Sequence, residues 1–520
     1  STPAPALGRL LPRVRGTDPR PGDAVIRFEQ VPEILGERLC GALPEDWPAG
    51  EIRSVEQDSR RIRPPGLFVA VRGTREDGRR YLEDAAANGA RAVVGQPPPE
   101  GPLPYLMVDD ARRSVAMLSV LQAGDPSARL ELIGITGTNG KTTTSWLLQA
   151  IWEGCGVDAA VLGTLGSGRP GALRAASHTT PEPPRFQALL RDLSDEGYRA
   201  VAAEISSHGL DQERSYGTRY RAVVFTNLSR DHLDYHGTFG AYRDAKRKLF
   251  HPAGRGRPDP VVAVANSDDP ATEAILEGSP DRRVTFGSDP AAEVRLRAME
   301  ASAQGIRMQI EVAGAVRAVV SPLIGAYNGR NLLAAYAAAF AVELPLDRVE
   351  QAIARGVHVP GRMERVDAGQ PFLVIVDYAH TPDALERVLA ALRPLTAGRL
   401  SVLFGCGGDR DPGKRSEMGE IAGRLADRIT LTSDNPRSED PGAILDAIRT
   451  GVRAGGREPD LVTPDREAAI FETIAAADAG DTVLVAGKGH ETTQETVAGR
   501  TPFDDRRVAT RALRSRGYGS

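Results

Sequence analysis

The sequence has few cysteines and no long apolar run. Cys40, Cys155 and Cys406 are widely separated along the 520 residues, in no spacing typical of a metal site or a disulfide framework, so we expect a reducing cytoplasm. No uninterrupted apolar run is long enough to span a bilayer. The formal net charge of -4 argues against nucleic acid or an anionic membrane as the main partner.

Lysine is also scarce, because all but five of the 65 basic residues are arginines. The exceptions are Lys141, Lys246, Lys248, Lys414 and Lys488. These lysines are candidates for tasks that arginine cannot perform, such as placing a compact charge on a phosphate or supplying an amine that loses its proton. The alternative is chance, which is weakened by the position of three of them in Gly-rich loops.

What remains is an ordinary globular composition, with 26% charged and 41% hydrophobic residues. A chain of this length predicts roughly three domains, at about 150 residues each. The Pro- and Arg-rich N-terminus, from Leu10 to Arg20, predicts a disordered or loosely tied extension.

The stretch Leu132–Thr144 predicts a phosphate-binding loop between a strand and a helix. Gly137 and Gly140 allow backbone N–H groups to converge on an anion at the helix N-terminus. Lys141 can reach the terminal phosphates, and the hydroxyl of Thr142 can hold Mg²⁺. The spacing departs from the usual pattern, since Ile135 stands where the first glycine is expected. The alternative is a tight turn that carries a lysine.

Strands alternate with helices from about Leu130 to Arg355, and the pattern restarts at about Val359. Such alternation predicts two α/β domains, the first a doubly wound, mostly parallel sheet. Polar residues follow most of the strands, and ligands bind beyond the carboxyl ends of parallel strands. We expect the two domains to form a cleft that closes on substrates. The segment before them, about Phe28 to Gly124, predicts short strands and turns with some helix.

Three side chains near the predicted loop are candidates for metal chemistry. Glu204 follows an apolar strand and is a candidate Mg²⁺ ligand, with a solvated strand end as the alternative. His232, among Asp231, Asp234 and His236, is a candidate second ligand or general base. Lys246 by itself fits the basic face of an amphipathic helix. Its amine could instead add CO₂ to form an anionic carbamate, which arginine cannot do.

Two arginines, Arg410 and Arg437, lie in loops that follow neighbouring strands. Arginine forms bidentate pairs with carboxylates, so the pair predicts an amino-acid substrate with more than one carboxylate. Salt bridges between the loops are an equally good explanation from the residues alone.

Taken together, the motifs of the chain after about Glu51 resemble the Mur ligase family, and within it the enzymes that add meso-2,6-diaminopimelate to UDP-N-acetylmuramoyl-L-alanyl-D-glutamate. The motifs that carry the resemblance are Thr136-Gly-Thr-Asn-Gly-Lys-Thr-Thr143, Thr179-Thr-Pro181, Glu204-Ile-Ser-Ser-His-Gly-Leu210, Thr226-Asn-Leu-Ser-Arg-Asp-His-Leu-Asp-Tyr-His-Gly237, Pro360-Gly-Arg-Met-Glu364, Asp377-Tyr-Ala-His-Thr-Pro-Asp383 and Asp434-Asn-Pro-Arg437.

The resemblance implies an α/β protein of three domains after a disordered or extended N-terminus at 1–27. These are an N-terminal α/β domain for the UDP substrate at 28–128, a central P-loop ATP-binding domain with a doubly wound, mostly parallel sheet at 129–357, and a C-terminal Rossmann-like α/β domain for the amino acid at 358–520. It also implies a cytoplasmic enzyme of peptidoglycan synthesis that acts on small molecules with ATP and Mg²⁺. We expect a monomer that binds neither nucleic acid nor a membrane.

The resemblance further assigns site residues. Lys141, Glu204, His232 and Lys246 are implied to be catalytic, with Thr142, Glu204, His232 and carbamylated Lys246 serving the metal ions. ATP would be held by Gly137, Thr138, Asn139, Gly140, Lys141, Thr142, Thr143, Asn331 and Asp377. The UDP-muramoyl-peptide would be held by Gln57, Ser59, Thr179, Thr180, Ser206, Gln212 and Arg214, and diaminopimelate by Arg410, Asp434, Asn435, Pro436, Arg437, Gly487 and Glu491. The loop Thr74-Arg75-Glu76 departs from the family pattern, which leaves the uridine contacts open.

The implied reaction fits these residues. ATP would phosphorylate the free γ-carboxylate of the D-Glu residue, and the amine of diaminopimelate would displace phosphate from the acyl phosphate. Diaminopimelate has a second carboxylate that lysine lacks, so we expect Arg437 to select it by about a hundredfold. The alternatives are another Mur ligase, a folylpolyglutamate-type ligase, or a P-loop protein that binds ATP as a regulatory or scaffold module.

Overall fold

The computed structural model describes residues 25–73, 76–97 and 101–519. The predicted N-terminal extension therefore lies outside the described residues up to position 24, as do Thr74 and Arg75 of the loop that departs from the family pattern. Ile26 is already part of a hydrophobic core, so the first folded segment begins before the predicted residue 28. The chain forms two compact units, of which the first is made of 1–297, 310–317 and 331–353 and the second of the remaining residues.

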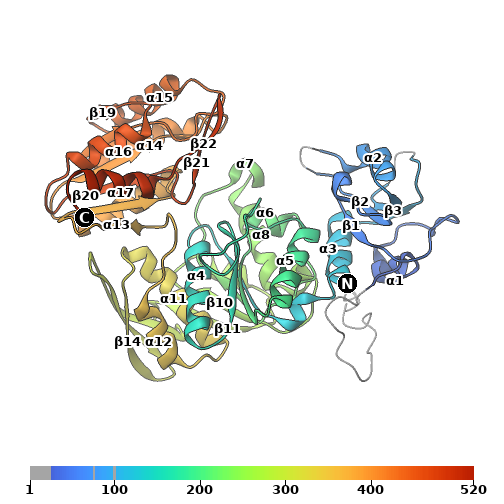
Figure 1. The fold of residues 1–520 in the computed structure, drawn as a ribbon. Helices are drawn as coiled ribbons and strands as arrows, with labels where there is room; N and C mark the ends of the chain where they lie inside the picture. Colours follow the sequence, from blue (N-terminus) through green and yellow to red (C-terminus); the bar gives the residue numbers. More distant parts are fainter. Residues whose placement is uncertain (1–24, 74–75, 98–100, 520) are drawn as a thin grey trace. The chain divides into compact units, whose positions relative to one another are not determined.

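The N-terminal part of the first unit is a small parallel sheet with the order β1-β2-β3-β4 (Figure 1). Its core comes from both layers, since Val69 and Val94 of the sheet pack with Val115 and Leu118 of one helix. Its strands are β1 (Ser54–Glu56), β2 (Gly66–Ala70), β3 (Ala90–Gly95) and β4 (Tyr105–Met107), and its helices are α1 (Val31–Leu35), α2 (Leu82–Ala87) and α3 (Ala111–Gln122). Helix α2 ends at Ala87, and Asn88 is its C-cap residue.

The central sheet has the order β14-β13-β12-β11-β10-β9-β5-β8-β6-β7. From β11 to β6 the neighbouring strands are parallel, and β7 is antiparallel to β6. The strands are β5 (Glu131–Thr136), β6 (Ala159–Gly163), β7 (Gly166–Gly168), β8 (Ala200–Glu204), β9 (Ala222–Phe225), β10 (Val262–Asn266), β11 (Arg282–Gly287), β12 (Val294–Ser302), β13 (Gly305–Val312) and β14 (Ala315–Ser321).

Helices cover this sheet, because strands such as β8 and β9 are buried along their whole length. The phosphate loop opens α4, and α5 packs against α3 of the N-terminal part. The helices are α4 (Lys141–Gly154), α5 (Pro183–Asp195), α6 (Ser207–Asp211), α7 (Leu233–His236), α8 (Phe239–Arg247), α9 (Pro252–Arg255), α10 (Thr272–Leu276), α11 (Ala326–Ala341) and α12 (Leu346–Arg355).

The second unit contains a sheet with the order β15-β16-β20-β17-β18-β19, parallel except for β15, and a separate hairpin of β21 and β22. Its strands are β15 (Glu364–Arg365), β16 (Leu373–Asp377), β17 (Leu400–Phe404), β18 (Arg428–Leu431), β19 (Leu461–Val462), β20 (Thr482–Ala486), β21 (Thr493–Thr496) and β22 (Gly499–Pro502). Its helices are α13 (Pro382–Leu392), α14 (Gly413–Leu425), α15 (Pro441–Ala454), α16 (Arg466–Ala475) and α17 (Asp505–Ser515).

The α/β fold class and the parallel sheets are confirmed, but some predicted boundaries are wrong. Glu204 and Asp377 are the last residues of their strands rather than the first residues beyond them, because each still pairs in register with a neighbouring strand. Helix α11 begins at Ala326, and Asn328 supports its first turn by donating to the carbonyl of Ile324. No helix in the described ranges is both long and apolar enough to cross a bilayer.

Candidate functional site

The predicted strand, loop and helix are present as β5, the loop 137–140 and α4. Gly137 has φ 149° and Gly140 has φ 87°. A Cβ on Gly137 would lie 1.9 Å from the hydroxyl oxygen of Thr226, and one on Gly140 would lie 2.1 Å from the side-chain oxygen of Asn331. Only glycine fits at either position, and Asn331 packs on the loop as its predicted role near the nucleotide requires.

The segment after β9 holds the loop in place. The Thr226 hydroxyl donates to the Asn139 carbonyl at 2.7 Å, and the Asn227 amide contacts the N–H and C=O of the same residue at 3.0 Å each. Thr138 accepts from the Ser229 N–H at 2.9 Å. The sequence placed this segment at the strand ends but did not identify Thr226 and Asn227 as supports of the loop.

Lys141 folds back over its own loop. Its amine donates to the carbonyls of Gly137 at 2.8 Å and Thr138 at 2.9 Å. Thr143 is buried at the start of α4. The ammonium therefore lies at the mouth of the loop, beside the helix N-terminus, where the backbone also favours an anion.

Glu204 lies directly against the start of α4. Its carboxylate accepts from the Thr142 hydroxyl at 2.9 Å and from the N–H and hydroxyl of Thr164 at 3.0 and 3.1 Å. No group of three His, Cys, Asp or Glu side chains that could hold a metal occurs within 25–73, 76–97 and 101–519. Mg²⁺ bound largely by phosphates and water needs only one or two protein oxygens, however, and the adjacent oxygens of Thr142 and Glu204 are of the kind that could supply them.

Lys246 is buried beneath the phosphate loop. Its amine donates to the carbonyl of Gly137 at 2.9 Å and lies 4.5 Å from the ring centre of Tyr242. Burial, reinforced by the charge of Lys141, holds the pKa of Lys246 well below its usual range. Only 1% of the residue is exposed, so the alternative of a basic solvent-facing helix surface is wrong for this lysine.

His232 lies in a cluster of aromatic side chains at the edge of the site. Its ring centre is 4.8 Å from that of His208 and 6.1 Å from that of Tyr242. Partial burial lowers the pKa of His232, an effect that Asp231 opposes and Lys141 adds to. Its role as a metal ligand remains a prediction, since the structure does not gather it with Glu204 and a third ligand.

The residues predicted for the UDP-muramoyl-peptide are largely connected to one another. Arg214 donates to the Thr180 carbonyl at 2.8 Å and to the Gln212 side chain at 2.8 Å, and it pairs with Glu182 at 2.7 Å. Glu182 in turn accepts from Gln57 of the N-terminal part at 2.8 Å. The sequence did not identify Glu182, which links the two parts of this group.

Of the other residues predicted for the UDP-muramoyl-peptide, Thr179, Thr180 and Ser206 lie close to Glu204, and Ser59 lies in the N-terminal part. Thr180 donates to the carbonyl of Glu204 at 2.9 Å, and Thr179 contacts Thr164 at 2.9 Å. Ser206 caps α6 by accepting from the N–H of Gly209. Ser59 is buried in the turn after β1. The substrate set and the phosphate loop therefore meet at Glu204.

In the second unit, four of the residues predicted for diaminopimelate form one buried group with Lys488. Lys488 donates to Asn435 and Glu491 at 3.0 Å each, and Asn435 donates to Glu491 at 2.9 Å. Burial works against the charge of Glu491, but Lys488 and Asn435 hold its pKa below the usual range. Burial raises the pKa of Asp434 against the opposing charges of Arg466 and Lys488. A Cβ on Gly487 would lie 2.6 Å from the Asp434 carboxylate.

Arg437 is held in place by the hairpin β21–β22. Its backbone is left-handed, with φ 53°, and its N–H donates to the carbonyl of Glu495 at 3.1 Å. The guanidinium donates to the Gly408 carbonyl at 2.7 Å and pairs with the Glu495 carboxylate at 3.3 Å. Glu495 was not identified from the sequence, because its distance from Arg437 along the chain gives no pairing signal.

The loop after β17 brings the two predicted arginines together. A Cβ on Gly407 would lie 2.9 Å from the guanidinium of Arg437 and 3.7 Å from the stem of Arg410, which is otherwise exposed. Pro436 is buried beside them. The alternative explanation for the two arginines was a salt bridge between their loops. Arg437 does form a salt bridge, but its partner is Glu495 of the hairpin and not an acidic residue of the loop that carries Arg410.

Asp377, predicted near the nucleotide, lies in the second unit at the end of β16. Its carboxylate accepts from the N–H groups of Met363 at 2.7 Å and Ala379 at 2.9 Å. Burial raises its pKa, opposed by Arg362. The carboxylate thus links the motif Pro360–Glu364 to the motif Asp377–Asp383. Its contact with the nucleotide stays a prediction.

Profiles of the Mur ligase family match three successive parts of the chain. The Mur ligase family catalytic domain matches residues 51–114, the Mur ligase middle domain matches 135–339, and the Mur ligase glutamate ligase domain matches 361–489.

Relatives match over almost their whole length. The UDP-N-acetylmuramoyl-L-alanyl-D-glutamate--2,6-diaminopimelate ligase of Solibacter usitatus is 43% identical over 94% of this chain and 98% of the relative. The protein of the same name from Pseudomonas aeruginosa is 44% identical over 89% and 95%. A solved structure of a ligase with this name has a TM-score of 0.69 and 34% identity over 95% of this chain and all of that one.

Proposed function

Because the chain belongs to the Mur ligase family, we propose that it joins meso-2,6-diaminopimelate to the D-Glu γ-carboxylate of UDP-N-acetylmuramoyl-L-alanyl-D-glutamate at the expense of ATP. The observation that carries this proposal is the near full-length similarity to ligases of that name, and the contact of Thr142 with Glu204 beside the phosphate loop supports it. The products would be the amide, ADP and phosphate, formed in the cytoplasm by a monomer.

The first step is transfer of the terminal phosphoryl group of ATP to the γ-carboxylate. The N–H groups of Gly137 to Thr143 and the ammonium of Lys141 hold the phosphates, so that charge on the moving group is neutralised at fixed positions. Thr142 and Glu204 would hold a Mg²⁺ ion, which supplies further positive charge to the phosphate oxygens. Asn331 and Asp377 would contact the nucleoside end.

Lys246 would act as a carbamate. Burial and the charge of Lys141 lower the pKa of Lys246, which favours the neutral amine, the form that adds CO₂ with loss of a proton to give an N-carboxylate. The new carboxylate would lie next to the phosphate loop, where the amine now meets the Gly137 carbonyl. There it would join Glu204 and His232 in serving the metal ions.

The second step is attack of the diaminopimelate amine on the acyl phosphate, with phosphate as the leaving group. Gln57, Ser59, Thr179, Thr180, Ser206, Gln212 and Arg214 would hold the UDP-muramoyl-peptide. Arg410 and Arg437 would take the carboxylates of diaminopimelate, and Asp434, Asn435, Pro436, Gly487 and Glu491 would shape the rest of its site.

The experiment is phosphate release with ATP, Mg²⁺ and UDP-N-acetylmuramoyl-L-Ala-D-Glu, comparing meso-diaminopimelate with L-lysine, and with the product identified by mass. Turnover with diaminopimelate alone supports the proposal in full. Equal turnover with lysine would remove the specificity assigned to Arg437 and keep the ligase. Phosphate release that does not depend on either amino acid would overturn the ligase.

A further inference from the structure

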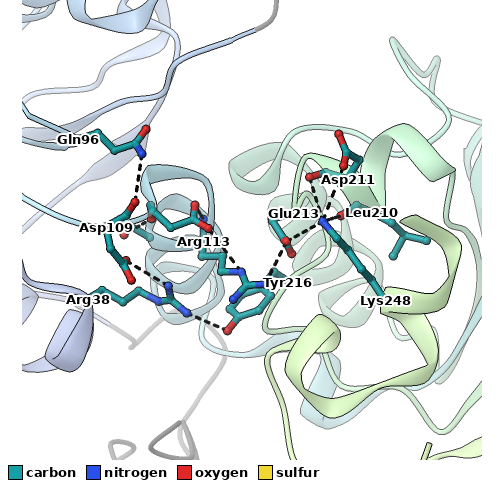
Figure 2. A network of polar contacts seen from close by, with 11 residues as sticks. Arg38, Gln96, Asp109, Arg113, Leu210, Asp211, Glu213, Tyr216 and Lys248 are labelled. Carbon is teal, nitrogen blue, oxygen red and sulfur yellow. Dashed lines mark hydrogen bonds and ion pairs between the residues drawn. The ribbon is translucent and has the colours of Figure 1, made fainter. Parts of the chain in front are cut away.

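Glu213 lies in the sequence between Gln212 and Arg214, two residues assigned to the UDP substrate, and its own side chain contacts Arg113 and Lys248 (Figure 2). It is 6% exposed, and its backbone is left-handed, with φ 57°. A residue with a Cβ adopts this conformation at a cost in free energy, so neighbouring contacts must hold it.

The first of these contacts is Lys248, which follows α8. Its ammonium pairs with a carboxylate oxygen of Glu213 at 3.0 Å. It also donates to the carbonyls of Leu210 and Asp211 at 3.4 and 3.3 Å. These are the last two carbonyls of α6, and that of Leu210 also accepts from the N–H of Glu213 at 3.2 Å. Lys248 therefore contacts both the C-terminal end of α6 and the side chain of Glu213, which follows it.

The second contact is Arg113 of α3, in the N-terminal part of the same unit. Its guanidinium approaches the same oxygen of Glu213 at 3.3 Å and lies 4.9 Å from the ring centre of Tyr216. Arg38 extends the cluster by donating to the Tyr216 hydroxyl at 3.2 Å and pairing with Asp109 at 3.3 Å. Figure 2 shows the resulting chain of contacts from the N-terminal part to Lys248.

The conformation at position 213 determines where its two neighbours point. Gln212 donates to Tyr235 at 2.9 Å, and Arg214 donates to the Thr180 carbonyl and to Gln212 itself at 2.8 Å each, so the two side chains form one connected group. Rotation of the backbone at Glu213 would turn at least one of them away. The ion pairs of Glu213 are therefore in a position to set the geometry of both.

We propose that Glu213, held between Arg113 and Lys248, is a positioning residue that sets Gln212 and Arg214 for the UDP-muramoyl-peptide; this rests on the proposed function. The clamp couples the N-terminal part to the substrate loop of the central domain. It explains why one of the few lysines of this chain stands at position 248, where a compact ammonium reaches two carbonyls and a carboxylate together.

The test measures steady-state kinetics of Glu213→Gly, Glu213→Gln and Lys248→Met. Glycine keeps the left-handed backbone without the side chain, so the fold is retained while the clamp is lost. We expect KM for the UDP-muramoyl-dipeptide to rise roughly 10-fold in Glu213→Gly and less in Glu213→Gln, with kcat and KM for ATP changing less than about 2-fold. Lys248→Met should add little to Glu213→Gly, because both remove one interaction.

Arg219→Met is the matched control. It is matched to Lys248→Met, because the Arg219 side chain is 31% exposed, against 29% for that of Lys248, and it pairs with Asp125 and Asp259. It should leave KM for the UDP substrate unchanged. An unchanged KM in Glu213→Gly, an equal rise in KM for ATP, or an equal rise in Arg219→Met would overturn the clamp. A wild-type chain that neither turns over nor binds the UDP substrate would instead overturn the proposed function and the clamp with it.

Discussion

Two lysines of this protein are almost completely buried, and their surroundings are opposite. Lys246 of the central domain is 1% exposed and meets a backbone carbonyl and the face of Tyr242. Lys488 of the second unit is 0% exposed and meets the carboxylate of Glu491 and the side-chain oxygen of Asn435. Among the described residues Lys246 has no ion-pair partner within 4 Å, and the charge of Lys141 lowers its pKa more than that of Asp231 raises it.

The presence or absence of a neighbouring carboxylate distinguishes two roles that a buried lysine can have. A buried ammonium with a carboxylate beside it is a fixed cation that organises its surroundings. A buried amine without one is driven toward its neutral form, which can react. On this basis we propose that Lys246 is the group that changes chemically, whereas Lys488 holds Asn435 and Glu491 together.

The largest expected effect follows from removing the reactive amine. Lys246→Met should lower kcat by about 10³-fold, as should Lys246→Arg, because neither side chain can form a carbamate next to the phosphate loop. In Lys246→Met the melting temperature should change little, since no buried charge loses a partner; Lys246→Arg, which buries a guanidinium without a carboxylate beside it, should melt lower. Phosphate release and calorimetry on the same samples measure both, and Arg243→Met on the same helix is the control. Retention of more than about a tenth of wild-type kcat would refute the role.

For Lys488 we expect a loss of stability instead of a loss of catalytic rate. Lys488→Met should lower the stability of the second unit by about 3 kcal/mol, because Glu491 and Asn435 lose their common partner. Scanning calorimetry detects this as a fall of roughly 6–12 °C in the transition of that unit. The double variant Lys488→Met with Glu491→Gln should be more stable than Lys488→Met alone, because the unpaired carboxylate is then removed. If Lys488→Met melts like the wild type, the contrast between the two lysines fails.

Arg437 extends the contrast to substrate selection. Arg437→Ala should raise KM for diaminopimelate by about 100-fold, the equivalent of one charged hydrogen-bonded pair. KM for the UDP substrate should stay constant. Glu495→Gln should have a smaller effect in the same direction, since it loosens the guanidinium without removing it. A variant that distinguishes diaminopimelate from lysine as well as the wild type does would show that selection lies elsewhere.

The smallest effect concerns the pH dependence of stability in the second unit. Burial lowers the pKa of His380 and of His490 to about 4. Below their unfolded pKa of about 6.5, the unfolded chain binds protons that the folded unit does not. Stability is therefore complete above about pH 6.5 and should fall by about 2 kcal/mol per histidine as the pH drops toward 4. His490→Asn should flatten this slope in urea titrations at pH 7 and pH 5; an equal slope would argue against the burial of a neutral ring.

Three features could be predicted from short stretches of sequence: the strand-loop-helix motif, the parallel sheets and the membership of the family. Glycine spacing, apolar runs and polar strand ends are read directly from neighbouring residues. The three cysteines are free, as their spacing indicated. The identity of the partners was less accessible. Glu495 pairs with Arg437, and Glu213 with Arg113 and Lys248, only because distant segments meet in the fold.

The same limit explains the errors. The sequence predicted that Glu204 and Asp377 follow their strands, because a charged residue after an apolar run usually marks the end of a strand. In the structure each still pairs with a residue of a neighbouring strand and so belongs to the sheet. For Lys246 the amphipathic pattern favoured an exposed face. The scarcity of lysine was the better signal, since the residue is buried against the phosphate loop.

The most direct test of the account follows the oxygen atoms of the substrate. UDP-N-acetylmuramoyl-L-Ala-D-Glu labelled with ¹⁸O in both oxygens of the γ-carboxylate is turned over with ATP, Mg²⁺ and meso-diaminopimelate. Activation of that carboxylate at the phosphate loop predicts one ¹⁸O atom in each released phosphate and one in the new amide. Released phosphate without ¹⁸O would show that ATP does not phosphorylate the substrate, and would contradict the account.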